Sequence, residues 1–282
     1  MFATLLTYAL FATAAFAHPS PGLNGRLARR AEARQSGPRL PSNGPASLSN
    51  ITNAEYSSNW AGAAFESPAL ILTIFPSGTF VVPTPKAPSG GGSGSFAASA
   101  WVGIDGDTCG TAILQTGIDF TVDVGRVSYD AWFEYLRPTS PRSRPKIAAG
   151  NTIKLIATVS SATSGTVVIE NVSTGVTVFK ALTSAARLCQ ENAEWIVEDF
   201  EEGNSLVPFA NFGTVTFSNA VATTVSGSTV GPTGAVIIDL EQNSQVLTSA
   251  STSSTAVTAT ECALTPRAFV CALRRTNYIE LD

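Results

Sequence analysis

The sequence predicts an all-β protein in which two antiparallel sheets pack into a sandwich. From residue 56 onward, runs rich in Val, Ile, Thr and aromatic residues are separated by Gly, Ser, Asn and Pro, which is typical of short strands joined by turns. Apolar and polar residues alternate most clearly over residues 152–159 (TIKLIATV), so successive side chains would point to opposite faces of a sheet. No segment keeps the 3.6-residue period of a capped amphipathic helix. Many short strands of this kind favour an antiparallel sandwich.

Ten strands are expected in chain order. They cover residues 78–83, 99–104, 112–122, 128–136, 152–160, 166–171, 176–181, 194–200, 214–222 and 236–241. Residues 85–94 (PKAPSGGGSG) have the composition of a flexible loop. The sequence shows no internal repeat and no sign of a second domain.

Residues 1–17 are predicted to be a secretory signal peptide. Residues 2–17 are apolar and end in Ala15-Phe16-Ala17, an A-x-A cleavage pattern, and the run is too short for a membrane-spanning helix. No other stretch is long enough to span a bilayer. We therefore expect a secreted, extracellular protein with no membrane attachment after cleavage.

A basic segment follows the signal peptide. Of the 17 basic and 21 acidic residues in the chain, five arginines and one glutamate lie within residues 18–54, a net charge of +4. Residues 55–282 keep the remaining 12 basic and 20 acidic residues, a net charge of −8. This split indicates a propeptide on an acidic domain (residues 55–260), with a disordered linker as the simpler alternative. A nucleic-acid-binding arm is not favoured, because the domain has the wrong sign of charge and a secretion signal precedes it.

The cysteines and two asparagines agree with secretion. Cys109, Cys189, Cys262 and Cys271 form no C-x-x-C pattern, and an even number in an oxidising compartment suggests disulfides. Asn50 and Asn171 each begin an N-x-S/T glycosylation signal.

The histidine content restricts the possible chemistry. The one histidine, His18, directly follows the predicted cleavage site, so the mature domain would have none. This excludes Ser-His-Asp and Cys-His catalysis and the usual zinc hydrolases. We expect neither a metal nor another cofactor. A hydrolase of this composition would have to use carboxylates, amides, hydroxyls or lysine.

Three segments place polar or acidic residues at alternate positions among tryptophans and β-branched residues. They are residues 99–117, 129–135 and 192–200. Alternate residues of a strand share a face, which groups Asp130 with Trp132 and Glu134, and Glu194 with Ile196 and Glu198. A carboxylate beside aromatic rings is partly desolvated, so its pKa should rise, which suits an acid or base at low pH.

Each of these residues also has a simpler interpretation. Alternating charges usually mark the solvated face of a strand, and Gln115 alone would be an ordinary polar strand residue. Trp101 and Trp195 alone would be core residues, and Asp105 in Gly-Ile-Asp-Gly would be a turn residue. The residues by themselves therefore indicate a secreted, histidine-free β-sandwich that would use carboxylates if it were an enzyme.

Five segments together resemble the fungal glutamic peptidases, the eqolisins. They are residues 57–63 (SSNWAGA), 99–117, 129–134, 192–202 and 212–219 (FGTVTFSN), and the resemblance extends over roughly residues 55–258. It implies a concanavalin A-like, lectin-like sandwich with a substrate cleft across one concave face. It also implies an acid endopeptidase that cleaves polypeptides, needs no cofactor and is insensitive to pepstatin. We expect this enzyme to be a monomer that is held inactive by its own propeptide.

The resemblance implies a catalytic Gln/Glu pair. The glutamine falls on Gln115 in AILQTG and the glutamate on Glu198 in WIVE, not on Glu194. The family positions around the cleft are Trp60, Gly62, Trp101, Asp105, Asp130 and Glu134, and a family disulfide falls on Cys109 and Cys189. The chemistry is suitable, because Glu198 could activate water and the Gln115 amide could donate a hydrogen bond to the oxyanion.

Two segments depart from the family pattern. Where the family has a stretch rich in Tyr and Asp, residues 136–146 carry four cations, Arg137, Arg142, Arg144 and Lys146, which leaves the subsite preference open. The chain also continues past the usual family end as an atypical tail, residues 261–282, in which Cys262 and Cys271 could still pair.

Two other functions stay open at this point. Four tryptophans, Trp60, Trp101, Trp132 and Trp195, could stack on sugar rings, and paired carboxylates also serve glycosidases. A glycan-binding or glycan-hydrolysing sandwich is therefore the second hypothesis, and an inactive secreted paralogue is the third. Gln115 separates the first two, because a glycosidase needs two carboxylates at catalytic spacing instead.

Overall fold

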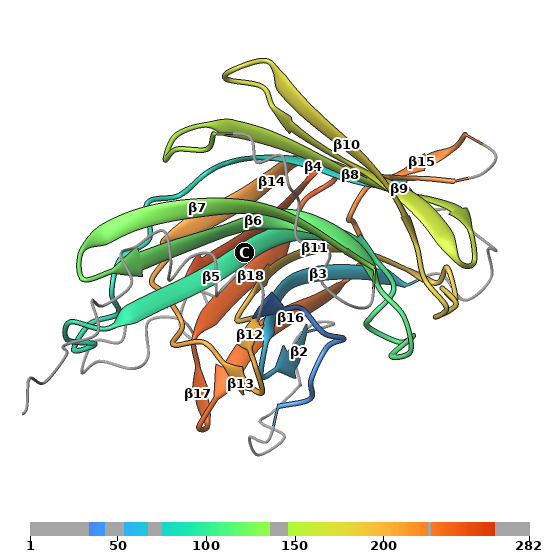
Figure 1. The fold of residues 1–282 in the computed structure, drawn as a ribbon. Coiled ribbons are helices and arrows are strands. Elements are labelled where there is room, and N and C mark those ends of the chain that lie inside the picture. The colour runs from blue at the N-terminus through green and yellow to red at the C-terminus, as the bar shows by residue number, and fades with distance from the viewer. Residues whose placement is uncertain (1–33, 43–53, 67–74, 136–145, 225–226, 263–282) are drawn as a thin grey trace, which may run out of the picture.

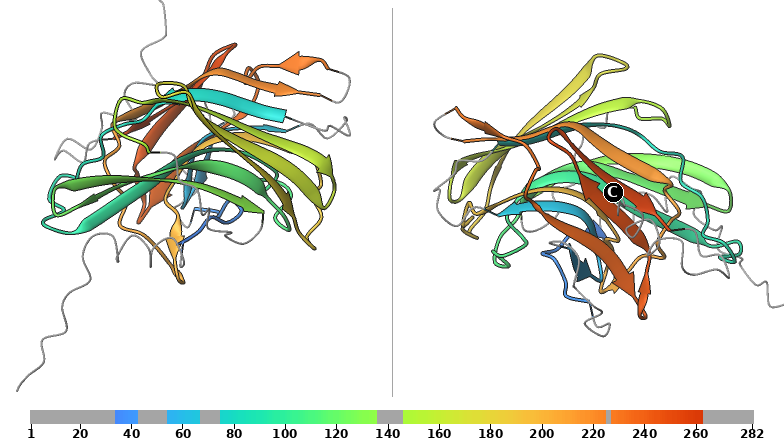
Figure 2. Two further views of the ribbon diagram at one scale, coloured as in Figure 1. Left: turned by 45° about the horizontal axis from the view of Figure 1, so that its top comes forward. Right: turned by 180° about the vertical axis from the view of Figure 1, so that it is seen from behind.

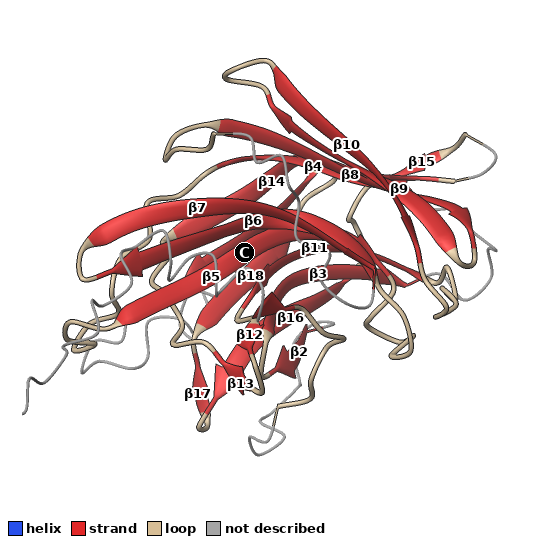
Figure 3. Cartoon of the chain, viewed as in Figure 1, coloured by secondary structure: helices blue, strands red, loops and turns tan. Residues whose placement is uncertain are grey.

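The computed structural model describes residues 34–42, 54–66, 75–135, 146–224 and 227–262, and the structural statements below refer to these ranges. Within them the chain forms strands and turns and no helix, as Figure 3 shows. No helix in the described residues could therefore cross a membrane. The predicted signal peptide and most of the C-terminal tail lie outside the described residues.

Two large sheets form the sandwich, as predicted (Figures 1 and 2). The first has the order β17 (Gln245–Val246), β16 (Val236–Gln242), β3 (Trp60–Glu66), β11 (Asn192–Glu198), β5 (Ser95–Ile104), β6 (Leu114–Asp123) and β7 (Arg126–Tyr135), and β2 (Ala54–Ser57) also pairs with β16. The second has the order β10 (Val176–Thr183), β9 (Ser164–Asn171), β8 (Thr152–Ser161), β4 (Phe75–Val81), β14 (Thr214–Thr223), β19 (Ala256–Glu261) and β18 (Thr248–Thr252), with β15 (Thr229–Val230) beside β14. All of these pairings are antiparallel except that of β2 with β16, which is parallel.

A third, small sheet joins residues 34–42, called the N-terminal segment below, to the sandwich. It consists of β1 (Arg34–Gln35), β12 (Glu201–Glu202) and β13 (Ser205–Leu206). In Figure 1, β1 lies in blue on the side of the first sheet that faces away from the second sheet. Residues of the predicted propeptide therefore lie against the domain.

Burial differs between the two sheets, and the difference indicates which sheet carries the candidate functional site. Along β8 and β9, buried and half-exposed residues alternate, so only one face of these strands is covered. By contrast, β5, β6 and β11 are buried on almost every residue, and so on both faces. One face contacts the core between the sheets, where Phe80 packs on Phe217 and the Trp195 Nε1 donates to the Ser77 carbonyl at 2.9 Å. The opposite face of β5, β6 and β11 must be covered by residues that do not belong to the core between the two sheets.

All ten predicted strands are present, with ends shifted by a few residues. Residues 85–94 form turns and one isolated β-bridge, from Lys86 to Asn211, in agreement with the predicted loop. The prediction omitted β3, whose sequence WAGAAFE is poor in the β-branched residues that favour strands. Small residues are needed there, because a Cβ on Gly62 would lie 2.1 Å from the Trp195 carbonyl oxygen of the neighbouring strand. Close packing of backbones thus overrides local propensity.

The predicted disulfide between Cys109 and Cys189 is confirmed, with Cα atoms 6.1 Å apart. It joins the segment after β5 to the segment before β11. Asp105 reinforces the same connection, because its carboxylate accepts hydrogen bonds from the backbone N–H groups of Gln190 and Glu191, both at 2.9 Å. Cys262 is disulfide-bonded as well, and Cys271 lies outside the described residues.

The two predicted glycosylation positions differ in what the structure describes. Asn50 lies outside the described residues. Asn171 is fully buried, and its Nδ2 donates to the Lys146 carbonyl and to Asn151 Oδ1, each at 3.1 Å. A glycan would occupy the same nitrogen, so this geometry argues against modification of Asn171.

Replacing both Cys109 and Cys189 by Ala should lower the free energy of unfolding by about 4 kcal/mol, an upper-end value for a closed loop of this length. Urea unfolding at one fixed pH measures the loss, and non-reducing peptide mapping of the unaltered chain serves as the control for the bond. An unchanged urea midpoint would mean that the Asp105 contacts alone hold the two segments together.

Candidate active site

The predicted catalytic residues lie on the face of the first sheet that points away from the core, called the polar face below. Register partners in an antiparallel ladder project to the same side of a sheet. Three rows of partners cross the sheet on this side: Glu134, Gln115, Gly103 and Glu194; then Trp132, Gly117, Trp101, Ile196 and Gly62; then Asp130, Asp119, Ser99, Glu198 and Trp60. Gln115 and Glu198 thus share one face with five of the six predicted substrate-binding residues.

Three indole rings form the floor of the polar face. Trp60 meets Trp101 edge-on, with ring centroids 4.9 Å apart. Two glycines make room for these rings: a Cβ on Gly117 would lie 2.5 Å from Trp101 Cβ and 2.8 Å from Trp132 Cζ2, and a Cβ on Gly103 would lie 2.7 Å from Trp101 Cζ3. The rings therefore lie close against the backbone, and the acidic groups beside them lose contact with water.

Glu198 is buried between this floor and the N-terminal segment. Its Oε2 accepts a hydrogen bond from Trp101 Nε1 at 2.8 Å and another from the Ser36 hydroxyl. Burial raises the pKa of Glu198 to about 8, although nearby Arg34 and the Ser36 hydrogen bond act in the opposite direction. With the segment in place, this carboxyl is therefore protonated in acid.

Gln115 lies fully buried on β6, directly opposite Glu134 on β7. Neither its side-chain oxygen nor its nitrogen has a hydrogen-bond partner among the described residues. A buried amide without a partner is destabilising by roughly 1–3 kcal/mol, and such groups are rare away from functional sites. The amide is thus free to bind an incoming polar group.

Glu134 and Asp119 make the polar face acidic. Glu134 Oε2 accepts from the Ser36 backbone N–H at 3.2 Å and lies 3.5 Å from Arg34 Nη1, while Asp119 Oδ2 lies 2.7 Å from Arg34 Nε. Burial raises the pKa of Glu134 to about 7, and Arg34 opposes that rise. The sequence analysis did not select Asp119, although Asp119 stands four residues after Gln115 on the same strand and so shares its face.

Glu194 is the other carboxyl of the AEWIVE segment, and its surroundings differ from those of Glu198. It is fully buried, and neither of its oxygens has a partner among the described residues. Burial raises its pKa well above the usual range, and the negative charges of Asp105 and Asp107 raise it further. Glu194 is therefore a neutral acid, whereas Glu198 carries the contacts that a catalytic group would use.

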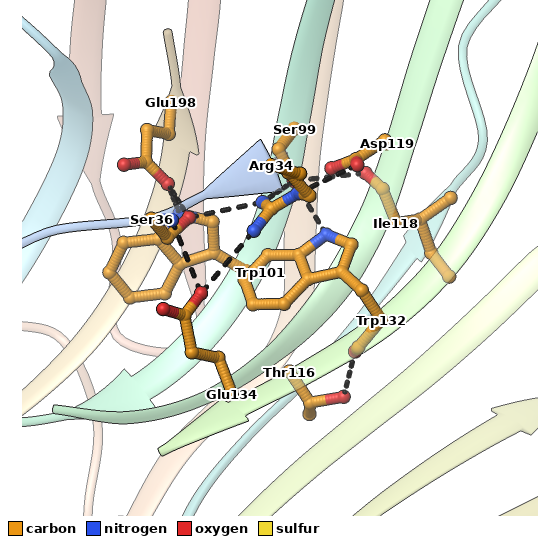
Figure 4. Close-up of polar contacts among 10 residues, drawn as sticks. All are labelled: Arg34, Ser36, Ser99, Trp101, Thr116, Ile118, Asp119, Trp132, Glu134 and Glu198. Carbon is orange, nitrogen blue, oxygen red and sulfur yellow. Dashed lines mark hydrogen bonds and ion pairs between the residues drawn. The ribbon is translucent and has the colours of Figure 1, made fainter. Parts of the chain in front are cut away.

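Residues 34–42 cross the polar face and cover Glu198, as Figure 4 shows for Arg34 and Ser36. β1 pairs with β12, and the Arg39 backbone N–H donates to the Gly106 carbonyl at 2.8 Å. The Arg39 guanidinium lies 2.9 Å from Asp107 Oδ1. The net charge of residues 18–54 predicted a propeptide, but it did not predict where the propeptide binds, because the sequence of residues 34–42 has no strand pattern.

Other predicted residues lie elsewhere. Asp105 is beyond the end of β5, and its described contacts are with the backbone of residues 190–192. Trp195 points to the opposite, core face, so the four tryptophans do not form one surface. Arg137, Arg142 and Arg144 lie outside the described residues, and Lys146 is exposed. Among the described residues no cluster of His, Cys, Asp and Glu could hold a metal ion.

Comparisons with known proteins agree with this geometry. The profile of the peptidase A4 family matches residues 58–261. Aspergillopepsin-2 of Aspergillus niger is 45% identical over 286 residues, covering 92% of this chain and 99% of that protein. Scytalidopepsin B of Scytalidium lignicola is 38% identical over 265 residues, covering 91% and 97%.

Solved structures of similar proteins show the same sandwich. Scytalido-glutamic peptidase with a transition state analog inhibitor superposes with a TM-score of 0.65 at 40% identity, over 73% of this chain and 98% of that one. Aspergilloglutamic peptidase from Aspergillus niger superposes with a TM-score of 0.57 at 50% identity, over 59% and 99%. With a family match over most of its length and a sandwich that carries Gln115 and Glu198 on one face, the chain belongs to the peptidase A4 family of glutamic peptidases.

Proposed function

We propose that this protein is a secreted endopeptidase that hydrolyses polypeptides in acid with Glu198 as the general base and Gln115 as the oxyanion donor. The observation that carries the proposal is the Ser36 hydroxyl, which donates a hydrogen bond to Glu198 Oε2. A hydroxyl at this position stands where a water molecule would lie before it attacks a peptide carbonyl. The similar solved structures support a polypeptide substrate, because scytalido-glutamic peptidase was solved with a peptide-based transition state analog and the eqolisin SCP-B with the tripeptide Ala-Ile-His.

The reaction follows from the two side chains. Ionised Glu198 takes a proton from water while the water oxygen attacks the carbonyl carbon. The Gln115 Nε2 donates a hydrogen bond to the oxyanion of the tetrahedral intermediate, a contact worth roughly 3–4 kcal/mol by analogy with other oxyanion donors. Protonated Glu198 then returns the proton to the leaving amine, the C–N bond breaks, and the base is regenerated. No metal or other cofactor takes part in these steps.

The N-terminal segment explains how such an enzyme would be held inactive. Ser36 occupies the water position, and burial under the segment keeps Glu198 protonated below a pH of about 8, so that Glu198 cannot act as a base. Removal of residues 34–42 readmits water and so relieves the main cause of the raised pKa, which is burial. We propose that residues 18–54 are an autoinhibitory propeptide and that residues 55–260 form the active monomer.

Glu198→Gln should abolish hydrolysis of denatured casein at every pH from about 2 to 6, because Glu198 is the carboxyl that accepts from the Ser36 hydroxyl at the water position, and no other carboxyl of the described residues does so. Glu194→Gln is the matched control, since an amide closely resembles the neutral carboxyl at that position. This control should fold and retain measurable turnover. Assays with and without pepstatin would exclude a contaminating aspartic protease, and an active Glu198→Gln enzyme would refute the assignment.

Gln115→Ala should lower kcat by roughly 100-fold or more, the effect of losing one oxyanion donor. Gln115→Glu should not restore the rate near neutral pH, because its charge would lie beside Glu134. Initial rates on one quenched fluorescent peptide measure both effects, and circular dichroism checks the fold. A fully active Gln115→Ala enzyme would remove the catalytic pair from the proposal and favour a glycan substrate.

A synthetic peptide of residues 18–54 should inhibit the activated enzyme at about pH 6 and release it at about pH 3. The net charge of +4 on residues 18–54 attracts the acidic domain, and this attraction weakens as the acidic residues of the domain, taken together, lose their charge in acid. Salt at about 0.5 M should weaken inhibition by screening the pair between Arg39 and the exposed Glu55. Arg34→Gln should cost the peptide most of its affinity, whereas the control Gln35→Ala, at an exposed position, should not. Equal inhibition at both pH values would make the segment a passive linker.

A further inference from the structure

The connection between β2 and β3 holds the N-terminal segment by its main chain. Three residues of this connection, Ser57, Ser58 and Asn59, are called the backbone clamp below. The Leu40 carbonyl accepts from the Ser57 hydroxyl at 2.8 Å and from the Ser58 N–H at 3.1 Å. The Leu40 N–H donates to Asn59 Oδ1 at 2.8 Å, and Asn59 Nδ2 donates to the Pro38 carbonyl at 3.3 Å. All four contacts use main-chain atoms of the segment, which every amino acid except proline can supply.

The side chains of the segment take no part in these contacts. Leu40 is 39% exposed, so its side chain is not buried in a pocket. On the other side of the segment, the Arg39 backbone N–H donates to the Gly106 carbonyl at 2.8 Å. The main chain is therefore held from both sides, as in complexes in which a peptide is bound like an added strand.

Contacts within the domain hold the backbone clamp in place. Gln242 Nε2 donates to the Ser58 carbonyl at 2.8 Å and to Asp199 Oδ2 at 2.7 Å. The Asp199 backbone N–H donates to the Asn59 carbonyl at 2.8 Å. The Ser57 hydroxyl also lies 2.9 Å from Asn59 Oδ1, so it has an acceptor when the segment is absent. The clamp would thus persist after residues 34–42 leave.

The position of the backbone clamp relative to Glu198 connects it to the reaction. Trp60, which directly follows Asn59, is the register partner of Glu198. The segment, blue in Figure 1, places Ser36 on Glu198 and Leu40, four residues later, in the clamp. A polypeptide that followed the same path would place a peptide bond over Glu198 and its next residues in the clamp.

We propose that the backbone clamp binds the main chain of a polypeptide substrate at the fourth residue after the residue held over Glu198, and that it accepts any side chain there. This inference rests on the proposed peptidase function. Such a site responds to the length of a chain and not to its sequence, so it favours long polypeptides over short peptides. Because the clamp lies away from the reacting bond, its contacts are equal in the bound substrate and the transition state, and they should lower KM without changing kcat.

The first test is a series of quenched fluorescent peptides that share one cleaved bond and extend one to six residues beyond it. Activated enzyme at about pH 4 should show a single fall in KM of about tenfold, as expected for several main-chain hydrogen bonds gained together. The residue that causes this fall, called the step residue below, should be the fourth or fifth beyond the bond, because the residue over Glu198 flanks the bond on one side or the other. Alanine, leucine and lysine at the step residue should give the same KM within about threefold.

The second test removes one main-chain donor. An N-methyl group on the amide nitrogen of the step residue removes the N–H that Leu40 donates to Asn59, so it should abolish most of the fall in KM. The matched control carries the N-methyl group one residue later, where the segment itself has Pro41 and therefore no N–H. This control peptide should keep the low KM.

The third test changes the enzyme. Asn59→Leu keeps a side chain of similar size and removes both amide contacts, so the ratio of kcat/KM between the long and short peptides should fall from about ten to near one. The control is Glu170→Gln on β9 of the second sheet, which should keep the ratio. The ratio compares two peptides on one enzyme, so a general loss of folded protein does not change it.

The outcomes separate this inference from the function on which it rests. Cleavage of casein together with a KM that does not change along the series would overturn the clamp and leave the peptidase function intact. A length effect that survives in Asn59→Leu would overturn the assignment to these residues. A fall in KM that appears only when peptides are extended before the cleaved bond would overturn the direction of binding, and the proposal with it. Failure to cleave casein and every peptide would overturn the proposed function itself.

Discussion

The close packing of indole rings on glycine backbone is the constraint on which the polar face depends. Gly103 and Gly117 leave no side chain between the strands and the rings of Trp101 and Trp132. The rings then exclude water from the polar face, which carries the buried acidic side chains of Asp119, Glu134, Glu194 and Glu198. A side chain at either glycine would lift the rings, readmit water and change the acidity of every carboxyl beside them.

This packing buries carboxyl groups, and the N-terminal segment supplies a cation, Arg34, that pairs with one of them. Buried carboxyls either remain neutral or need a cation, because an isolated buried charge is strongly destabilising. Glu194 remains neutral, with its pKa raised well above the usual range. Asp119 instead pairs with Arg34, which also lies beside Glu134. The segment thus pairs with buried acidic residues of the sheet in the same region where it covers Glu198.

The sequence predicted the sandwich because its strands are short, separated by turns and rich in β-branched residues. It did not predict β3, in which the small residues of WAGAAFE serve close backbone packing and carry no strand signal. The resemblance located Gln115 and Glu198, and the two-residue period would also have identified Asp119 on the strand of Gln115. Nothing local could place Arg34 and Ser36, because their positions depend on contacts with residues 65 to 162 positions away in the chain.

Only eleven residues separate residue 42 from residue 54 in the sequence, and this has a consequence for how the covered form would open. The Leu40 carbonyl accepts from the Ser58 backbone N–H and the Ser57 hydroxyl, so the segment ends beside the strand that begins the domain. While the chain is intact, this tether holds the segment near the polar face at an effective concentration in the millimolar range, as for other short linkers. A single cut between residues 42 and 54 would change no contact of Arg34 or Ser36 with the polar face, yet it would make rebinding depend on the concentration of free segment. Dilution would then make the opening irreversible.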